Sequence, residues 1–120
     1  MTDLKKSLED YGADYKTTLA RFMNNEQIYL RILQKFPQDD TLQKLGQALQ
    51  DGDYANAFNA AHTLKGVTGN LGLTPLYEAV CAIVEPLRAG KVHEDLAARY
   101  QLIQEEYQKF LDLLAQLAEK

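Results

Sequence analysis

His62 is the side chain that the surrounding sequence best equips for chemistry. Neutral imidazole is a competent nucleophile near pH 7, and the N–P bond that it forms can pass a phosphoryl group to a carboxylate. Lys65 follows three residues later in a predicted helix, so its ammonium can swing beside the imidazole and neutralise phosphoryl oxygens. We therefore expect His62 to be phosphorylated and Lys65 to neutralise the charge.

Two glycines follow His62 inside the same predicted helix. Gly66 and Gly69 should each cost about 0.5–1 kcal/mol there relative to alanine, and the fold alone gives no reason for both. With no side chain one turn beyond His62, a bulky partner could bring an acceptor atom into line with the ring nitrogen. We expect Gly66 to provide this clearance for the partner.

The helical wheel places His62 on the solvent side of its helix. At about 100° per residue, one side collects the residues expected in the core, namely Tyr54, Ala57, Ala61, Leu64, Thr68 and Leu71. His62 lies about 160° from Leu64 on this wheel, so the imidazole should point to solvent. A buried core histidine is thereby disfavoured.

The wheel positions around His62 predict a surface for docking a partner protein. These positions hold Ala55, Phe58, Asn59, Gly66 and Gly69. Between Asp53 and Gly72 only Asp53 and Lys65 are charged, although 25% of the chain is charged. Surfaces depleted of charge tend to be docking surfaces, so we expect a partner to contact Ala55, Phe58, Asn59 and Gly69. For Phe58 a second interpretation stays open, in which its ring leans back onto the core.

Each of these residues also has an ordinary structural explanation. An exposed helical histidine is usually only solvated, and Lys65 alone would be a surface charge. Gly72 can simply end its helix. The functional interpretation is preferred because Lys65, Gly66 and Gly69 all accompany His62.

Helices must position this site, because apolar residues recur at spacings of three and four almost throughout and β-branched alternation is absent. The pattern predicts an all-α fold. Its centre is an antiparallel four-helix bundle with short loops, formed by residues 40–118 with helices over about 40–50, 54–71, 75–89 and 94–118. Before it we expect capping helices in residues 1–36: two short pieces interrupted by Gly12, then a helix over 26–36 that Asn25 caps and Pro37 ends.

Local signals also predict the bounds of the helix over 75–89. Thr74 should cap it, Pro75 should be its first residue, and Gly90 should end it. Pro86 lies inside this helix and removes one backbone hydrogen bond, so we expect the last turn after Val84 to be kinked or frayed.

Composition restricts the class of protein. The length of 120 residues fits a single domain spanning 1–120, and 46% hydrophobic residues suffice for a core. A formal charge of −4 and the absence of a basic run argue against nucleic acid or an anionic membrane as partner. The first residues lack an apolar signal segment and there is one cysteine, so we expect a cytoplasmic protein. No window approaches the roughly 20 apolar residues of a membrane-spanning helix. We expect a monomer, because the apolar stripes can be buried internally.

The remaining candidate residues receive structural roles. One cysteine and two histidines cannot make a Cys2His2-type zinc site, and no metal site is expected. Cys81 lies in an apolar run and should behave as a small hydrophobe. His93 lies in or near the connection after Gly90 and gets no role. Tyr100 and Tyr107 follow core spacing rather than forming a platform for nucleotide stacking.

The sequence around His62 resembles the histidine-containing phosphotransfer (HPt) domain of two-component phosphorelays. The resemblance rests on Ala61-His62-Thr63-Leu64-Lys65-Gly66, followed by Gly69, Leu71 and Gly72. The family's motif is a histidine with lysine three, glycine four and a further glycine ten residues later, and the resemblance extends over about 40–118. It implies a phosphorylatable His62, a charge-neutralising Lys65 and open room at Gly66.

The resemblance also implies the partners of this chain. Family members take phosphate from a receiver-domain aspartate or a histidine kinase and hand it to the receiver domain of a response regulator. The receiver's own acidic pocket holds Mg²⁺, so no cofactor of this chain's own is expected. One departure concerns the next helix, where family members often carry glutamine near the other ring nitrogen. This chain has Val84 at that offset, with Glu85 adjacent.

Three functions compete at this point. A phosphocarrier is favoured over a kinase because the chain has neither a P-loop nor a G-x-G-x-x-G motif to hold ATP. The alternative is a helical adaptor that docks receiver or other signalling proteins without being phosphorylated. A hydrolase with His62 as general base lacks a positioned serine, cysteine or metal.

Overall fold

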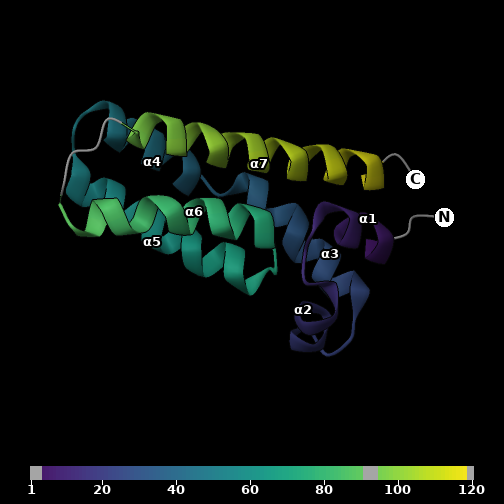
Figure 1. The fold of residues 1–120 in the computed structure, drawn as a ribbon. Helices are drawn as coiled ribbons and strands as arrows, with labels where there is room; N and C mark the ends of the chain where they lie inside the picture. Colours follow the sequence, from purple (N-terminus) through teal and green to yellow (C-terminus); the bar gives the residue numbers. More distant parts are fainter. Residues whose placement is uncertain (1–3, 91–94, 119–120) are drawn as a thin grey trace.

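The computed structural model describes residues 4–90 and 95–118, and within these ranges every regular element is helical. The elements in chain order are α1 (Leu4–Tyr11), α2 (Tyr15–Arg21), α3 (Glu26–Lys35), the 3-10 turn η1 (Phe36–Gln38), α4 (Thr41–Gln50), α5 (Tyr54–Asn70), α6 (Thr74–Arg88) and α7 (Leu96–Ala118). Helices α4 to α7 run side by side as an antiparallel bundle (Figure 1). The predicted all-α four-helix bundle is therefore confirmed.

Capping side chains define where several helices begin. The Asn25 side chain accepts hydrogen bonds from the backbone N–H groups of Gln27 and Ile28, as expected of an N-cap. Asp53 caps α5 in the same way by accepting from the N–H of Asn56. The cap at Asn25 was predicted from residue type and position alone.

The bundle closes where α7 returns to α4. The Tyr100 ring lies directly over Gly46, and its hydroxyl donates to the carbonyl of Leu42 at 3.1 Å. Tyr107 packs edge-on against Phe36, with the ring centroids 5.7 Å apart. Both tyrosines are half-buried against the core, which confirms their predicted structural role.

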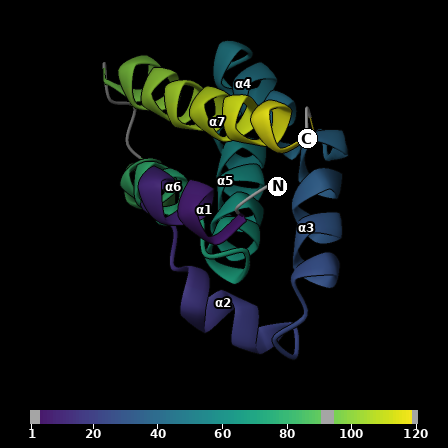
Figure 2. The same cartoon turned by 90° about the vertical axis from the view of Figure 1, so that its right-hand side faces the viewer.

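The N-terminal helices extend the bundle along its length. Because α7 is longer than α6, its C-terminal half projects beyond the start of α6 and is covered there by α1 (Figure 1). Leu4 and Leu8 of α1 are buried, and the hydroxyl of Tyr11 donates to the carbonyl of Glu106 at 3.3 Å. Helix α2 lies on the opposite side of the molecule from α7 (Figure 2).

Helix α2 is joined to the turn between α5 and α6. The N–H of Asp14 donates to the carbonyl of Gly72 at 2.9 Å. Gly72 has φ +69°, and a Cβ there would overlap Thr18 Oγ1, so glycine is required both by the backbone and by this close approach. Gly72 ends its helix as expected. The hydrogen bond from Asp14 holds the start of α2 against the end of α5.

The structure corrects two local predictions about α6. The helix begins one residue early: Leu73 is the N-cap without a side-chain hydrogen bond, and Thr74 lies inside the helix. Leu73 is fully buried directly after the Gly72 turn, so its packing sets the start of the helix. The predicted fraying of the last turn is also absent, because α6 continues through Pro86 to Arg88.

A hydrogen bond from α7 explains why Pro86 does not end the helix. Proline has no N–H to give to the carbonyl of Ala82, four residues earlier. Arg99 supplies the missing donor, with its Nη1 atom 2.6 Å from that carbonyl oxygen. The next turn is closed by the N–H of Ala89, which donates to Glu85.

None of the helices in the described ranges combines the length and the apolar character needed to cross a membrane.

Candidate functional site

Helix α5 places the candidate site on its outer face. The buried residues of α5 are Ala57, Ala61, Leu64 and Thr68. They form the predicted core side, and Leu71 is buried just beyond the helix end. His62 lies away from this side and is exposed. The expectation that its imidazole points to solvent is confirmed.

The imidazole of His62 is oriented by an aromatic ring rather than by a hydrogen bond. The Phe58 ring stacks on it, with centroids 5.8 Å apart and planes 22° from parallel. Arg88 reaches over from α6, with its guanidinium carbon 5.8 Å from the Phe58 centroid. Among the described residues His62 has no hydrogen-bond or ion-pair partner. Both of its ring edges can therefore meet an incoming group.

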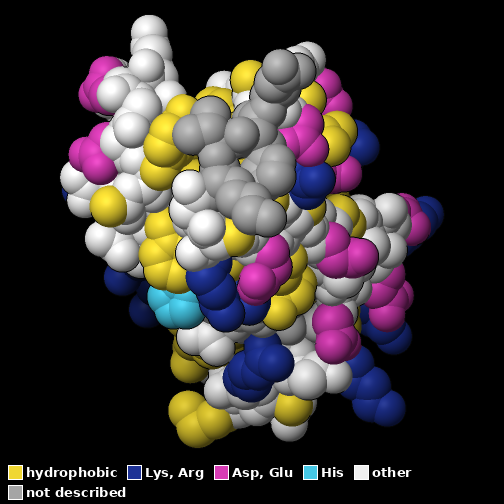
Figure 3. Space-filling model, turned by 60° about the vertical axis from the view of Figure 1, so that its left-hand side comes forward, with side chains coloured by type: hydrophobic (Ala, Val, Ile, Leu, Met, Phe, Trp, Pro, Cys, Tyr) yellow, Lys and Arg dark blue, Asp and Glu magenta, His cyan; other side chains and the backbone are white. Residues whose placement is uncertain are grey.

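The structure supports the interpretation in which the Phe58 ring leans onto the core, and contact with a docking partner stays a prediction. Phe58 is half-buried and packs against the core, yet one part of its ring contacts His62 at the surface. Figure 3 shows the histidine at the surface, with hydrophobic and basic side chains bordering it. The ring thus links the core to the imidazole.

A shallow hollow of about 380 Å³ adjoins His62. It is lined by Arg21, His62, Lys65, Gly66, Gly69, Asn70 and Tyr77. No acidic residue belongs to this lining, and neither cation in it has an ion-pair partner among the described residues. The hollow is therefore positively charged on a chain whose formal charge is −4.

The two glycines differ in their surroundings. At Gly66 an added Cβ would meet no atom within 4 Å, so the surface beside the imidazole is open. At Gly69 an added Cβ would lie 3.1 Å from Tyr77 Cε1, closer than ordinary contact. The open space expected beyond His62 is present at Gly66, whereas Gly69 is where α5 and α6 approach closely.

The other predicted docking residues are spread over two regions. Ala55 is exposed one turn before Phe58. Asn59 lines a separate polar hollow between α4 and α5, together with Thr63. Of the four, Phe58 contacts the imidazole and Gly69 lines its hollow.

The sequence left open what replaces the usual polar neighbour of the second ring nitrogen. Val84 is 1% exposed and belongs to the core, so it does not face His62. Glu85 is exposed, and its Oε1 lies 3.7 Å from Arg88 Nη1. Neither residue hydrogen-bonds the imidazole.

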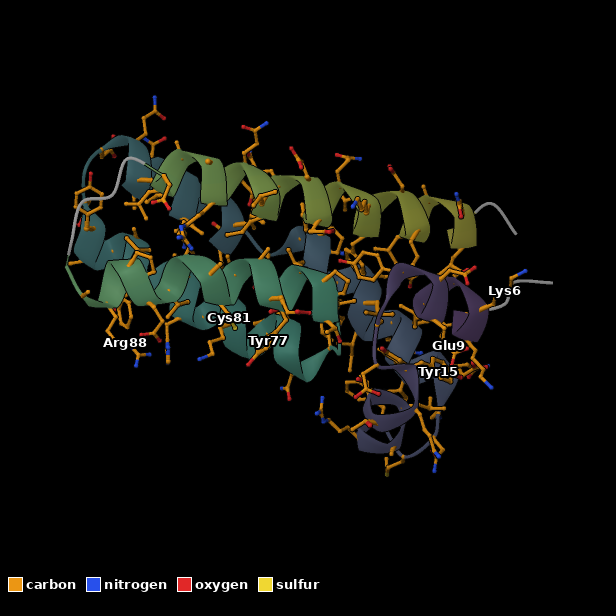
Figure 4. The ribbon with its side chains drawn as sticks, in the orientation of Figure 1. Lys6, Glu9, Tyr15, Tyr77, Cys81 and Arg88 are labelled. Carbon is orange, nitrogen blue, oxygen red and sulfur yellow. The ribbon has the colours of Figure 1, made fainter. Side chains whose placement is uncertain are left out.

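Helix α6 contributes residues to this region that the sequence analysis did not assign to the site. Tyr77, Cys81 and Arg88 project from one edge of α6 on the side of α5 (Figure 4). Cys81 is half-buried rather than enclosed in the core, and its contact with Tyr77 raises the pKa of the tyrosine. Positions four and seven residues apart on a helix share an edge, so this arrangement was deducible once the facing helix was known. His93 lies outside the described residues.

Arg21 is the residue of the hollow that lies farthest from His62 in sequence. Its Nη1 atom donates to the carbonyls of Gly69 and Asn70 at 3.1 and 3.0 Å. A helical pattern cannot relate positions forty-one residues apart, so no signal in the sequence could have placed Arg21 here. In the described residues no group of three or more His, Cys, Asp or Glu side chains is placed to hold a metal ion.

Comparison with known families gives one match. The family model described as Hpt domain matches residues 33–120. No match was found among curated proteins or among solved structures. The matched range contains η1 and the four bundle helices, and it begins after α2 and most of α3.

Proposed function

The chain belongs to the Hpt domain family, and from that premise we propose that His62 accepts a phosphoryl group and passes it to the receiver domain of a response regulator. Members of this family act as phosphocarriers in two-component phosphorelays rather than as enzymes with an ATP site. The donor is a receiver-domain aspartate or a histidine kinase. We expect Mg²⁺ to be held by the receiver and not by this chain.

One observation carries the proposal most strongly: an exposed imidazole beside a positively charged hollow with open space at Gly66. A nucleophile that exchanges phosphate with another protein must be reachable by that protein's active site. A cation beside it must be free to meet the oxygens. His62 is exposed, and Lys65 lines the hollow beside it without an ion-pair partner among the described residues.

The chemistry balances with the residues of this chain and the partner's aspartyl phosphate. The unprotonated nitrogen of neutral His62 attacks phosphorus, an N–P bond forms, and the P–O bond to the aspartate breaks to release its carboxylate. The other ring nitrogen keeps its proton throughout. Lys65 offsets the negative charge on the equatorial oxygens, and the reverse attack by a receiver carboxylate regenerates the imidazole.

Phosphate transfer from purified phosphorylated receiver domains tests the proposal. The wild-type chain should acquire label that is labile in acid and stable in alkali. His62→Gln should acquire none, and because His62 is exposed this variant should fold as the wild type does.

The matched control is Lys65→Gln, which keeps the nucleophile and removes the cation. It should still be labelled, but at a lower rate. Labelling of His62→Gln at the wild-type rate would refute the assignment of the phosphoacceptor. Receiver binding without any labelling of the wild type would favour the alternative of a non-phosphorylated adaptor.

A further inference from the structure

The hollow beside His62 has a wall that does not come from the bundle. Arg21, at the end of α2, lines it together with Lys65 and Gly66 of α5. A second hollow continues from Arg21 along α2 to Asp14 and shares Gly69 and Tyr77 with the first, as well as Arg21 itself. The concave surface that starts at His62 therefore extends beneath α2.

The hydrogen bonds of Arg21 leave much of its guanidinium unused. Both of its hydrogen bonds in the described structure come from one nitrogen, Nη1, and go to the carbonyls of Gly69 and Asn70. Nε and Nη2 donate to no described residue, and Arg21 is exposed. A guanidinium presents five N–H donors in a planar fork that binds carboxylates in two-point geometry.

Arg21 is anchored farther along α5 from His62 than Lys65 is. It is anchored at Gly69, seven residues beyond His62, and seven residues of helix rise by about 10 Å. Lys65, only three residues from His62, is therefore the nearer of the two cations in the hollow along α5. Arg21 can reach a side chain of a protein whose active site is seated over His62.

We propose that Arg21 is a specificity-determining residue of this phosphocarrier, which binds an acidic side chain on the receiver domain docked over His62. The inference rests on the proposed function, because it takes a receiver as the partner. Its independent basis is charge: the hollow has two cations and no acid on a chain of formal charge −4. Arg21 precedes the family match at residue 33, so α2 would adapt a general bundle to particular receivers.

The competing explanation is that Arg21 only anchors α2. A cation at the end of a helix interacts favourably with the last carbonyls, and Arg21 has this arrangement at the end of α5. An anchor would affect the stability of α2 but not the salt dependence of partner binding. Charge contributed to an interface changes both the affinity and its response to ionic strength.

The test measures binding of purified receiver domains with Mg²⁺ to the full chain, by calorimetry at low and high salt. Arg21→Gln removes the charge and keeps amide donors for the two carbonyls, while Arg21→Lys keeps the charge. Arg31→Gln makes the same change of net charge at an exposed position of α3 outside both hollows, and serves as the matched control.

We expect Arg21→Gln to weaken receiver binding roughly three- to ten-fold at low salt and to flatten its salt dependence. Arg21→Lys should retain most of the affinity, and Arg31→Gln should bind as the wild type does. Wild-type affinity and salt response in Arg21→Gln would overturn the inference, as would an equal loss in Arg31→Gln.

The outcomes separate this inference from the proposed function. If receivers bind and Arg21→Gln weakens them but no phosphate is transferred, the role of Arg21 stands and the phosphocarrier proposal fails. If phosphate is transferred and Arg21→Gln binds normally, only the role of Arg21 fails. A wild-type chain that binds no receiver overturns both.

Discussion

Substitution of Gly66 should change stability and phosphate transfer in opposite directions. The added Cβ of Gly66→Ala meets no atom within 4 Å, so alanine fits without strain in the middle of α5. Its helix propensity exceeds that of glycine by about 0.8–1.0 kcal/mol. With an unfolding entropy of about 2.1 cal/mol/K per residue, 1 kcal/mol raises the melting temperature of a 120-residue domain by about 4 °C.

The effect on transfer follows from the same open space. Gly66 lies one turn beyond His62 and lines the hollow that a receiver would cover. A side chain there holds the partner's aspartate away from the imidazole, and a misplacement of about 1 Å can cost about 100-fold in rate. The rate of phosphate transfer should therefore be highest in the wild type, lower in Gly66→Ala and lowest in Gly66→Met. Both variants should nevertheless be more stable than the wild type.

The assay follows phosphate transfer from a phosphorylated receiver by quenched flow and unfolding by calorimetry. Phosphoramidate, a small phosphodonor that does not need the docking surface, is the control. It should label Gly66→Met at the wild-type rate, which shows that His62 is intact. The reasoning about clearance is refuted if Gly66→Met accepts phosphate from the receiver as fast as the wild type does.

Three further predictions concern positioning and stability. Phe58→Leu should slow transfer about two- to ten-fold, and the His62 ring protons should move downfield by NMR because the stacked ring is lost. Gly72→Ala should lower the free energy of unfolding by about 2 kcal/mol or more in urea titrations, because φ is +69° and the Cβ would overlap Thr18. Burial raises the pKa of Tyr29 from 10.0 to about 12, because the folded state favours the neutral phenol. The contribution of Tyr29 to the free energy of unfolding is therefore complete below pH 10 and is lost as pH rises through 12. Tyr29→Phe should remove that pH dependence and cost about 1 kcal/mol at pH 7, since the hydroxyl donates to the carbonyl of Leu71.

Periodicity was sufficient to predict the helices and the two faces of α5, and capping signals placed the start of α3 but not that of α6. The spacing of Ala57, Ala61 and Leu64 identified the buried side, and so the outward direction of His62. These properties are local, because a helix repeats every 3.6 residues and its caps lie next to its ends. The roles of the site residues remain predictions.

The parts that the sequence did not predict depend on contacts between distant segments. Pro86 alone predicts a kinked or frayed last turn, and only the position of Arg99 on α7 shows how the freed carbonyl of Ala82 is satisfied. In the same way Arg21 joins the hollow of His62 through tertiary packing of α2. Neither relation has a period or a spacing that could have been recognised in advance.

The two glycines after His62 look alike in the sequence, but the structure gives them different explanations. Glycine at Gly69 permits the close approach of Tyr77, so packing between α5 and α6 offsets its low helix propensity. At Gly66 an added Cβ would meet no atom of the described residues within 4 Å, so no packing in that part of the chain offsets its low helix propensity of about 1 kcal/mol. Access of a partner to His62, which we propose above, would account for glycine at this position. For this reason Gly66, rather than Gly69, is the position where stability and transfer should separate.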